Sequence, residues 1–439
     1  MKLHKPTKQL VITSCFLAFL FVMMAGLVLS VVLRRLGVME AVPAYTTDVP
    51  DETVEPVNIR QTYPIAESAQ TEAPATMYDW VKRVENTLRG LIGTIETFSN
   101  ENVPARTDFI ELYIKIQKAL GSRVIDGDDV VIKMTNGSLT FLSDELTEEE
   151  ADICADNLIG FAEYARAQGA EFLYVQPPNK INKYDVKLPE GVEDYANANA
   201  DGLIGALGDA GVPVLDLRDS IVEDLDFDKA FYDSDHHWTP DTGLWAAGRI
   251  LEELNNRYDA DFDLTKTDRA NYEEEVHESM FLGALGKKTG LGYVPLDDMS
   301  VLSPAYETDF TMEVATSGYV YKGDFIRAFI DETQLEIGDY YMKNPYAAYF
   351  RDDQALVHVT NHKAPEGKKV LLLKDSFGIS TAPFMATAIR ELDVIDLRHF
   401  NGSLEAYVAE TQPDIVVVMY NPKAITAPAG YHADLFDFQ

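Results

Sequence analysis

The segment KKVLLLKDSFG, residues 368–378, contains the unit on which the predicted fold is built. Its apolar run is short and continuous, as in a strand that is buried on both faces of a parallel sheet. Asp375 and Ser376 follow this strand directly, and residues 377–392 then have helical spacing. A buried strand followed by a helix is the repeating unit of α/β proteins, in which helices cover a parallel sheet.

The same unit recurs on both sides of this segment. Short apolar runs that predict further strands occupy residues 172–176, 212–217, 393–400 and 414–421. The helical patterns beside them occupy residues 148–168, 193–209, 240–254 and 403–411. Five strands separated by helices predict an α/β fold with a parallel sheet that is covered on both faces.

Two of these helices have recognisable first residues. Thr147 precedes three glutamates, a favourable N-cap with an acidic first turn. Thr239 precedes Pro240, and proline is favoured at the first position of a helix. Each helix has an apolar face that should be buried, formed by Cys154, Leu158, Phe161 and Ala165 in the first and by Leu244, Ala247, Leu251 and Leu254 in the second.

The N-terminal part predicts a membrane anchor. Residues 10–33 carry no charge, and at about 1.5 Å per residue they would span about 36 Å, enough for a ~30 Å hydrocarbon core. The run exceeds the apolar region of a cleavable signal, so we expect an uncleaved transmembrane helix. Basic residues on both sides, with a slight excess before the span, favour a cytoplasmic N-terminus and an extracytoplasmic remainder.

The rest of the chain divides by composition. The predicted parts are a tail and anchor (1–36), a flexible linker rich in Pro, Thr, Ala and Glu (37–76), the first part of the α/β domain (77–255), a β-rich insertion (256–365) and the second part of the domain (366–439). The net charge is −35, and beyond residue 36 there are 32 Lys and Arg against 72 Asp and Glu, a net −40. Such a surface repels phosphate backbones, so we exclude nucleic acid as a partner.

Polar residues follow several of the predicted strands. Ligands of parallel α/β sheets bind outside the carboxyl ends of the strands. Asn179 and Lys180, which could contact substrate, follow the first strand, and Gly402 and Asn421 lie at the ends of the last two. Ser376 lies at a predicted helix start, where its backbone N–H and the helix dipole would face a developing anion. Its alternative role is that of a helix cap.

A second group of ionisable residues lies in FYDSDHHWTP, residues 231–240. A nucleophilic serine needs a base and an acid that orients the base, and two spacings in this stretch supply both: Asp235 with His237, or Asp233 with His236. A metal site and a solvated turn are the alternatives. Adjacent ligands rarely converge on one ion, and no H-E-x-x-H or C-x-x-C motif is present, so we predict no metal and no cofactor.

These motifs resemble those of known families. KDSFG (374–378) resembles the first block of the SGNH (GDSL) hydrolases, in which a serine follows an aspartate, and Gly402 and Asn421 resemble the second-block glycine and third-block asparagine. The Asp/His block lies at the C-terminus of those enzymes but precedes the serine here, so the order resembles a circular permutation. With its D-x-H-W-T-P segment, the chain resembles the DHHW family and the AlgJ/AlgX-type alginate O-acetylation proteins over roughly 97–260 and 366–439.

The resemblance implies an SGNH hydrolase-like, flavodoxin-like fold of three layers with roles for the quoted residues. His237 would deprotonate Ser376, and Asp235 would hold the tautomer of His237; we prefer this spacing because the Trp-Thr-Pro that follows aligns with it. The N–H groups of Ser376 and Gly402 and the Asn421 side chain would form the oxyanion hole. Lys374 departs from the family, because the first block has glycine at that position.

The implied function is a membrane-anchored, extracytoplasmic serine O-acetyltransferase, or an acetylesterase, that acts on a cell-envelope or exported polysaccharide. The resemblance also implies a membrane-bound O-acyltransferase partner that supplies acyl groups across the bilayer. The alternative is a non-catalytic glycan-binding or assembly protein that retains the fold.

Overall fold

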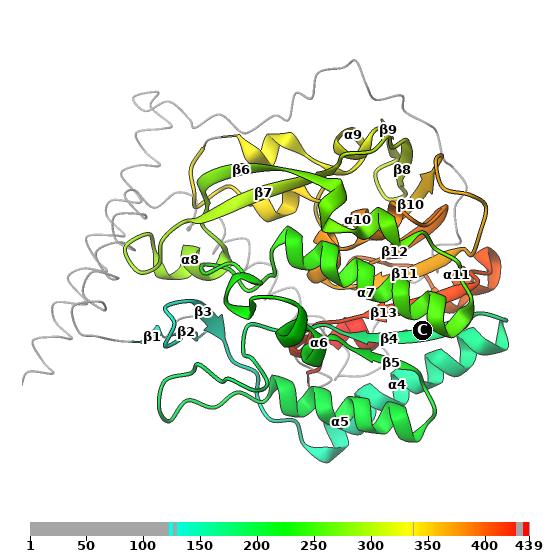
Figure 1. Ribbon diagram of the computed structural model, residues 1–439. Helices are drawn as coiled ribbons and strands as arrows, with labels where there is room; N and C mark the ends of the chain where they lie inside the picture. Colours follow the sequence, from blue (N-terminus) through cyan, green and yellow to red (C-terminus); the bar gives the residue numbers. More distant parts are fainter. Residues whose placement is uncertain (1–122, 126–129, 337, 427–432, 439) are drawn as a thin grey trace, which may run out of the picture. The chain divides into compact units, whose positions relative to one another are not determined.

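The computed structural model describes residues 123–125, 130–336, 338–426 and 433–438 (Figure 1). The predicted membrane anchor and linker lie outside these residues. Among the helices that are described, none is both long and apolar enough to cross a bilayer.

The centre of the fold contains the five parallel strands that the sequence predicts. They are β4 (Glu171–Gln176), β5 (Val214–Asp216), β11 (Val370–Lys374), β12 (Glu391–Ile395) and β13 (Ile415–Met419). Their spatial order is β5-β4-β13-β11-β12, and each neighbouring pair is parallel. If β11, β12, β13, β4 and β5 are renumbered 1 to 5, the spatial order read from β12 is 2-1-3-4-5, the order of flavodoxin-like sheets. The sheet therefore has a flavodoxin-like arrangement with a permuted chain order.

The sheet is mixed, so the prediction of a wholly parallel sheet is wrong. Three strands of the insertion, β8 (Phe310–Val314), β9 (Tyr319–Gly323) and β10 (Leu356–Asn361), extend it beyond β12 to eight strands within the described part of the chain. β10 pairs antiparallel with β12, and β8 pairs antiparallel with β10 and β9. Buried and half-buried residues alternate along β8, as is typical of antiparallel strands with one covered face.

Other short strands lie outside this sheet. β6 (Tyr272–Phe281) and β7 (Asp297–Pro304) form an antiparallel pair within the insertion. β1 (Val124–Ile125), β2 (Val131–Lys133) and β3 (Leu139–Phe141) form a small antiparallel sheet. Leu139 of β3 donates its N–H to the carbonyl oxygen of Asp233 at 2.8 Å, so this small sheet is bound to the loop that carries the Asp/His motif.

Helices cover both faces of the sheet and give the three predicted layers (Figure 1). One core cluster contains α4 (Glu148–Ala167), α5 (Ala196–Asp209) and α11 (Leu404–Thr411), and the other contains α6 (Leu217–Asp224) and α7 (Pro240–Tyr258). Successive residues of β11 belong alternately to the two clusters, with Leu371 and Leu373 in the first and Val370 and Leu372 in the second. A strand that packs on both faces must be apolar throughout, which explains its unbroken apolar run.

The predicted helix starts are confirmed. Thr147 caps α4 and forms a capping box with Glu150, and α7 begins at Pro240 with Thr239 as the N-cap residue. The Thr239 hydroxyl contacts the Thr242 hydroxyl at 3.2 Å and makes no cap bond to the helix backbone. The apolar faces predicted for both helices are buried.

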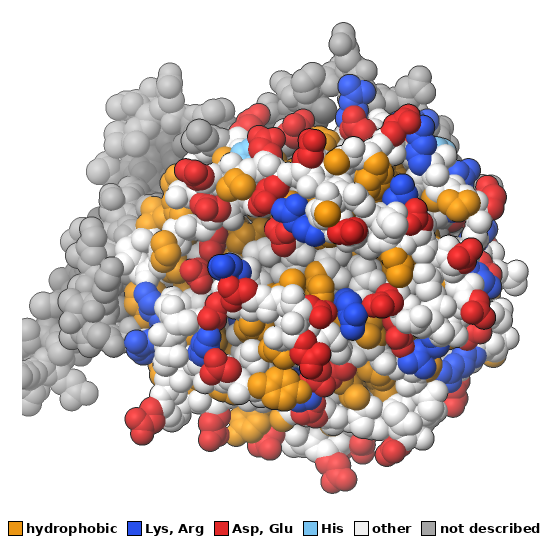
Figure 2. Space-filling model, viewed as in Figure 1, with side chains coloured by type: hydrophobic (Ala, Val, Ile, Leu, Met, Phe, Trp, Pro, Cys, Tyr) orange, Lys and Arg blue, Asp and Glu red, His pale blue; other side chains and the backbone are white. Residues whose placement is uncertain are grey.

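The surface of the described domain is acidic, as the composition implies. Figure 2 shows acidic side chains spread over the whole visible face, with Lys and Arg side chains interspersed among them. The acidic side chains are therefore not confined to one patch of this face. A surface of this kind attracts polyanions poorly.

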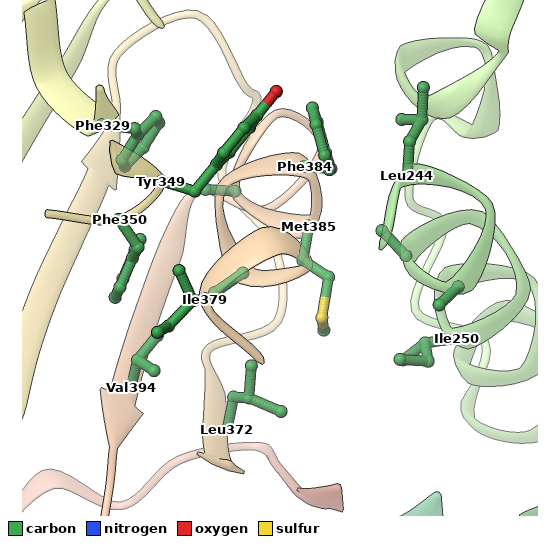
Figure 3. Close-up of a cluster of buried hydrophobic side chains, with 14 of the residues drawn as sticks. Leu244, Ile250, Phe329, Tyr349, Phe350, Leu372, Ile379, Phe384, Met385 and Val394 are labelled. Carbon is green, nitrogen blue, oxygen red and sulfur yellow. The ribbon is translucent and has the colours of Figure 1, made fainter. Parts of the chain in front are cut away.

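The helix predicted for residues 377–392 is wrong in extent. The segment forms a 3₁₀ helix, η6 (Ser376–Ser380), and a short helix, α10 (Ala382–Ala386), and β12 already begins at Glu391. Pro383 lacks an N–H and its ring would clash with the carbonyl of a continuous preceding turn, so one helix cannot pass through it. The two short helices still bury their apolar side chains: Ile379, Phe384 and Met385 lie in the core that also includes residues of α7 and the insertion (Figure 3).

Candidate active site

The structure brings Ser376, His237 and Asp235 together at the carboxyl end of β11. Ser376 follows this strand, and the other two residues lie in the loop before α7. His237 Nε2 lies 2.7 Å from Ser376 Oγ, and His237 Nδ1 lies 2.6 Å from Asp235 Oδ1. These two contacts form a serine–histidine–aspartate chain with the D-x-H spacing, an arrangement in which a histidine can act as a base and an aspartate can orient it.

Asp235 is fixed on both of its carboxylate oxygens. Oδ1 also accepts the backbone N–H of His237 at 3.0 Å, and Oδ2 accepts that of Ala284 at 2.6 Å. Gly283 permits this approach, because a Cβ there would lie 2.2 Å from Asp235 Cβ. Burial alone would raise the pKa of Asp235, but the two neighbouring histidines and the hydrogen bonds from His237 hold it well below its usual range. Asp235 is therefore a carboxylate that keeps the proton of His237 on Nδ1.

Two aromatic residues position His237 and the Ser376 loop. The Tyr346 ring stacks on the His237 ring, with centroids 4.1 Å apart and an angle of 14° between the planes. Its hydroxyl donates to the carbonyl oxygen of Ser376 at 2.9 Å. Trp238 is fully buried, and its indole N–H donates to the carbonyl oxygen of Phe377 at 3.0 Å. The tryptophan of the DHHW motif thus binds the histidine loop to the serine loop.

His236 has a different environment, which disfavours the D-x-x-H spacing. Its ring packs edge-on against Phe141, with centroids 5.3 Å apart, and its Nδ1 has no hydrogen-bond partner among the described residues. Burial lowers the pKa of His236 well below its usual value, so the ring is neutral. Asp233, its proposed partner, is exposed.

The metal alternative fits this geometry less well than the triad does. Asp235, His236 and His237 each offer one ligand atom, and these atoms lie within 4.8 Å of one another. However, both oxygens of Asp235 already accept hydrogen bonds, and His237 Nε2 faces Ser376. A metal ion would have to displace these contacts, so the donor set favours a triad.

The predicted oxyanion hole is brought together in part. The register of β11 and β13 pairs Lys374 with Met419, which places Asn421 level with Ser376. The Asn421 amide donates to Asp375 Oδ2 at 2.5 Å and its oxygen accepts the N–H of Lys423, so its orientation is fixed. Gly402 lies beyond β12, the neighbour of β11 on the other side. Its role as an oxyanion donor stays a prediction.

Comparisons with known proteins identify a similar domain and a similar fold. Residues 140–309 match the family model of an SGNH hydrolase-like domain described for the acetyltransferase AlgX. This segment is therefore similar to the SGNH hydrolase-like domain of AlgX-type proteins. The resemblance predicted from the KDSFG and DHHW motifs is therefore confirmed.

Solved structures show the same SGNH-like fold. PatB1 from Bacillus cereus, solved with a sulfonyl adduct, is 18% identical, with a TM-score of 0.59 and coverage of 72% of this chain and 100% of PatB1. A DHHW family protein from Eubacterium siraeum is also 18% identical, with a TM-score of 0.50 and coverage of 72% and 97%. At this identity the similarity establishes the fold alone. No curated protein sequence matches the chain.

Lys374, which replaces the glycine of the SGNH first block, belongs to a buried ionic network. Its side chain is fully buried, and its ammonium binds Asp353 and, at 3.0 Å, Asp396. Arg398 binds the same two carboxylates at 2.9 and 2.5 Å. Burial alone would raise the pKa of Asp396, but Lys374 and Arg398 outweigh it and lower the pKa. The network connects β11, directly before the nucleophile, to the segment that leads from β12 to Gly402.

The environment of Lys180 disfavours its predicted contact with substrate. It is 6% exposed, and its ammonium donates to the carbonyl oxygens of Tyr232, Asp233 and Asp235. These three bonds use all the donors of the ammonium, so none is left for a ligand. Burial lowers the pKa of Lys180 to about 8. Lys180 therefore holds the Asp/His loop in place.

The side-chain NH2 group of Asn179 has two donors that no described residue uses. Its Oδ1 accepts the N–H of Ile181 at 2.9 Å, while its buried Nδ2 has no hydrogen-bond partner in the described part of the chain. A buried amide that is left unpaired calls for an explanation, such as a ligand. The predicted role of Asn179 in substrate binding stays a prediction.

Sequence reasoning missed Tyr346 and the supporting role of the insertion. Tyr346, Gly283 and Ala284 all contact the triad, and all three lie in the segment predicted only as a β-rich insertion. The sequence signal was weak, because aromatic residues are frequent in this insertion and most of them belong to the core.

Proposed function

We propose that this chain is a membrane-anchored, extracytoplasmic serine O-acetyltransferase that acts on a polysaccharide. The observation that supports it is the unbroken chain from Ser376 Oγ through His237 to Asp235, with contacts of 2.7 and 2.6 Å. The matched family model, described for an acetyltransferase, supports acetyl as the transferred group.

In the first half of the reaction, the serine takes the acetyl group from a donor ester. His237 Nε2 accepts the Ser376 proton while Oγ attacks the carbonyl carbon, and the resulting imidazolium is stabilised by Asp235. The tetrahedral oxyanion would be held by the N–H groups of Ser376 and Gly402 and by Asn421. The intermediate collapses, the donor's C–O bond breaks, and the leaving alkoxide takes the proton from His237.

In the second half, a sugar hydroxyl takes the acetyl group. His237 accepts the hydroxyl proton as the sugar oxygen attacks the acetyl-serine carbonyl. Collapse of the second intermediate releases the O-acetyl sugar, and Ser376 recovers its proton from His237. Water in place of the sugar would give acetate, so transfer requires that a bound acceptor outcompete ~55 M water through positioning.

The location and partner follow from the sequence in this proposal. The apolar run at residues 10–33 would anchor the chain, and the domain would lie outside the cytoplasm. A membrane-bound O-acyltransferase would then supply the acetyl group across the bilayer.

The proposal is tested with the full chain in detergent and an aryl acetate as donor. Wild type should release the aryl alcohol, and Ser376→Ala should be slower by about 10⁴-fold, as for other serine nucleophiles. With an oligosaccharide acceptor, wild type should also form acetylated sugar. Equal inertness of both variants, with glycan binding intact, would identify a binding protein. Acetate release that no acceptor diverts would identify an esterase.

A further inference from the structure

An open groove of about 270 Å³ lies on the insertion. One wall is the end of β6, from His277 to Met280, and the other contains Tyr340, Lys343 and Pro345. The volume is close to the lower end of the range of about 300–1,000 Å³ that is usual for small-molecule sites.

Each wall is followed in the sequence by a residue that contacts the Asp/His loop. Met280 precedes Phe281, whose ring packs edge-on against Tyr232 with centroids 4.9 Å apart. Pro345 precedes Tyr346, whose ring stacks on His237. Successive Cα atoms are about 3.8 Å apart, so the groove begins one residue away from the supports of the triad.

The β6 wall has an irregular backbone. The β6–β7 register shifts between His277 and Phe281, and Ser279 has a φ of 50°, which is unusual for a residue other than glycine. The Ser279 N–H donates to Asp298 Oδ1 at 2.7 Å, which holds this conformation. Bulges and strained residues are over-represented next to active sites, where they redirect side chains.

The groove also contains an unpaired buried donor or acceptor. His277 Nε2 has no hydrogen-bond partner among the described residues, and its nearest carboxylate oxygen, on Glu275, is 3.7 Å away. Buried polar atoms are usually paired, so an unpaired one in a groove indicates a polar ligand.

The charges in the groove define the kind of ligand. Glu278 and Glu336 line it, and neither carboxylate pairs with a cation in the described part of the chain. Lys343 donates one N–H of its ammonium to the carbonyl oxygen of Thr333 at 2.8 Å and keeps two donors, so the groove has one cation against two carboxylates. Tyr340 adds a partly exposed ring. Carboxylates that accept hydrogen bonds, beside an aromatic ring, suit a hydroxyl-rich sugar and repel a sugar acid.

We propose that this groove is the acceptor subsite, and that it binds an uncharged, hydroxyl-rich segment of polysaccharide in preference to a polyuronate. The inference rests on the proposed transferase function. It adds to that function a place for the acceptor and a preference for its charge.

Binding is measured by calorimetry with the full-length Ser376→Ala chain, so that the result does not depend on turnover. The probes are cellopentaose, xylopentaose and chitopentaose, with a mannuronate pentamer as the anionic probe. At least one neutral probe should bind more tightly than the uronate. Tyr340→Ala should weaken that binding about tenfold, whereas Tyr319→Ala, an exposed tyrosine of the same insertion outside the groove, should leave it unchanged. The double variant Glu278→Gln/Glu336→Gln should reduce the preference against uronate.

The kinetic arm uses the same groove variants with Ser376 present. Tyr340→Ala should lower acetyl transfer to the neutral acceptor about tenfold more than it lowers aryl acetate hydrolysis. Equal loss of both rates, or no binding of any neutral probe, would overturn the subsite. Normal neutral-probe binding by a chain with no serine-dependent turnover would instead overturn the proposed function and leave the subsite standing.

Discussion

Replacement of Lys374 by methionine tests whether the buried network before the nucleophile holds the domain together. Methionine has a similar length and no charge, so the change leaves Asp353 and Asp396 with Arg398 as their shared cation. Removal of one partner from a buried ion pair costs about 3–5 kcal/mol, and we expect about 3 kcal/mol because Arg398 still binds both carboxylates. For a domain of about 300 residues, that loss lowers the Tm by roughly 5 °C.

The matched control is Lys369→Met, on the same segment of chain. Lys369 pairs with Glu391 at 3.2 Å, but about half of each side chain is exposed, so its loss should change stability by no more than about 0.5 kcal/mol. Both variants are measured by thermal unfolding and by aryl acetate turnover. Lys374→Met should also turn over more slowly, because its backbone leads into Ser376. If Lys374→Met melts with wild type, or no lower than Lys369→Met, our account of the network is refuted.

Three further predictions concern the histidines and the topology. His237→Ala should abolish aryl acetate turnover while His236→Ala keeps most of it, and Asp235→Asn should cost more than Asp233→Asn; the opposite ranking of rates would establish the D-x-x-H spacing. Because the pKa of His236 is lowered in the folded state, its ring gains a proton mainly on unfolding, and the stability of the domain should fall as the pH drops below about 6.5. Between pH 7.5 and pH 5.5, the Tm of His236→Asn should therefore decrease less than that of wild type. Equal decreases in Tm would show that His236 is not responsible. Protease added to intact cells should remove the folded domain, and a protected domain would contradict the extracytoplasmic location.

The parallel part of the fold could be predicted because its signals are local. Each of the five strands is a short apolar run beside a helical pattern, and packing on both faces imposes that run. The extension of the sheet by β8, β9 and β10 could not be predicted in this way. Alternating strands of an insertion look the same whether they pair with one another or with β12, because the pairing depends on contacts between distant parts of the chain.

The residues of the candidate site could be predicted only where they lie in local sequence motifs. Ser376, Asp235 and His237 lie in short motifs whose residue types suit acyl transfer. Tyr346 and Ala284 support the same triad, but a tyrosine in an aromatic-rich segment and a backbone N–H carry no local signature. The three carbonyl contacts of Lys180 could not be predicted, because a lysine after a strand looks the same in the sequence whether it faces solvent or binds backbone carbonyls.

The pairing of β4 with β13 has a consequence for biosynthesis. β4 is the earliest strand of the large sheet to leave the ribosome and β13 is the latest, yet Glu171 lies opposite Ile415. Until the last strand arrives, one edge of β4 has no partner, and an unpaired edge is a site for aggregation. Such distant pairing is also slow to form. A chain that is cut short before β13 would therefore not make a smaller version of this sheet, because β5-β4 and the strands from β11 to β9 would remain two separate pieces.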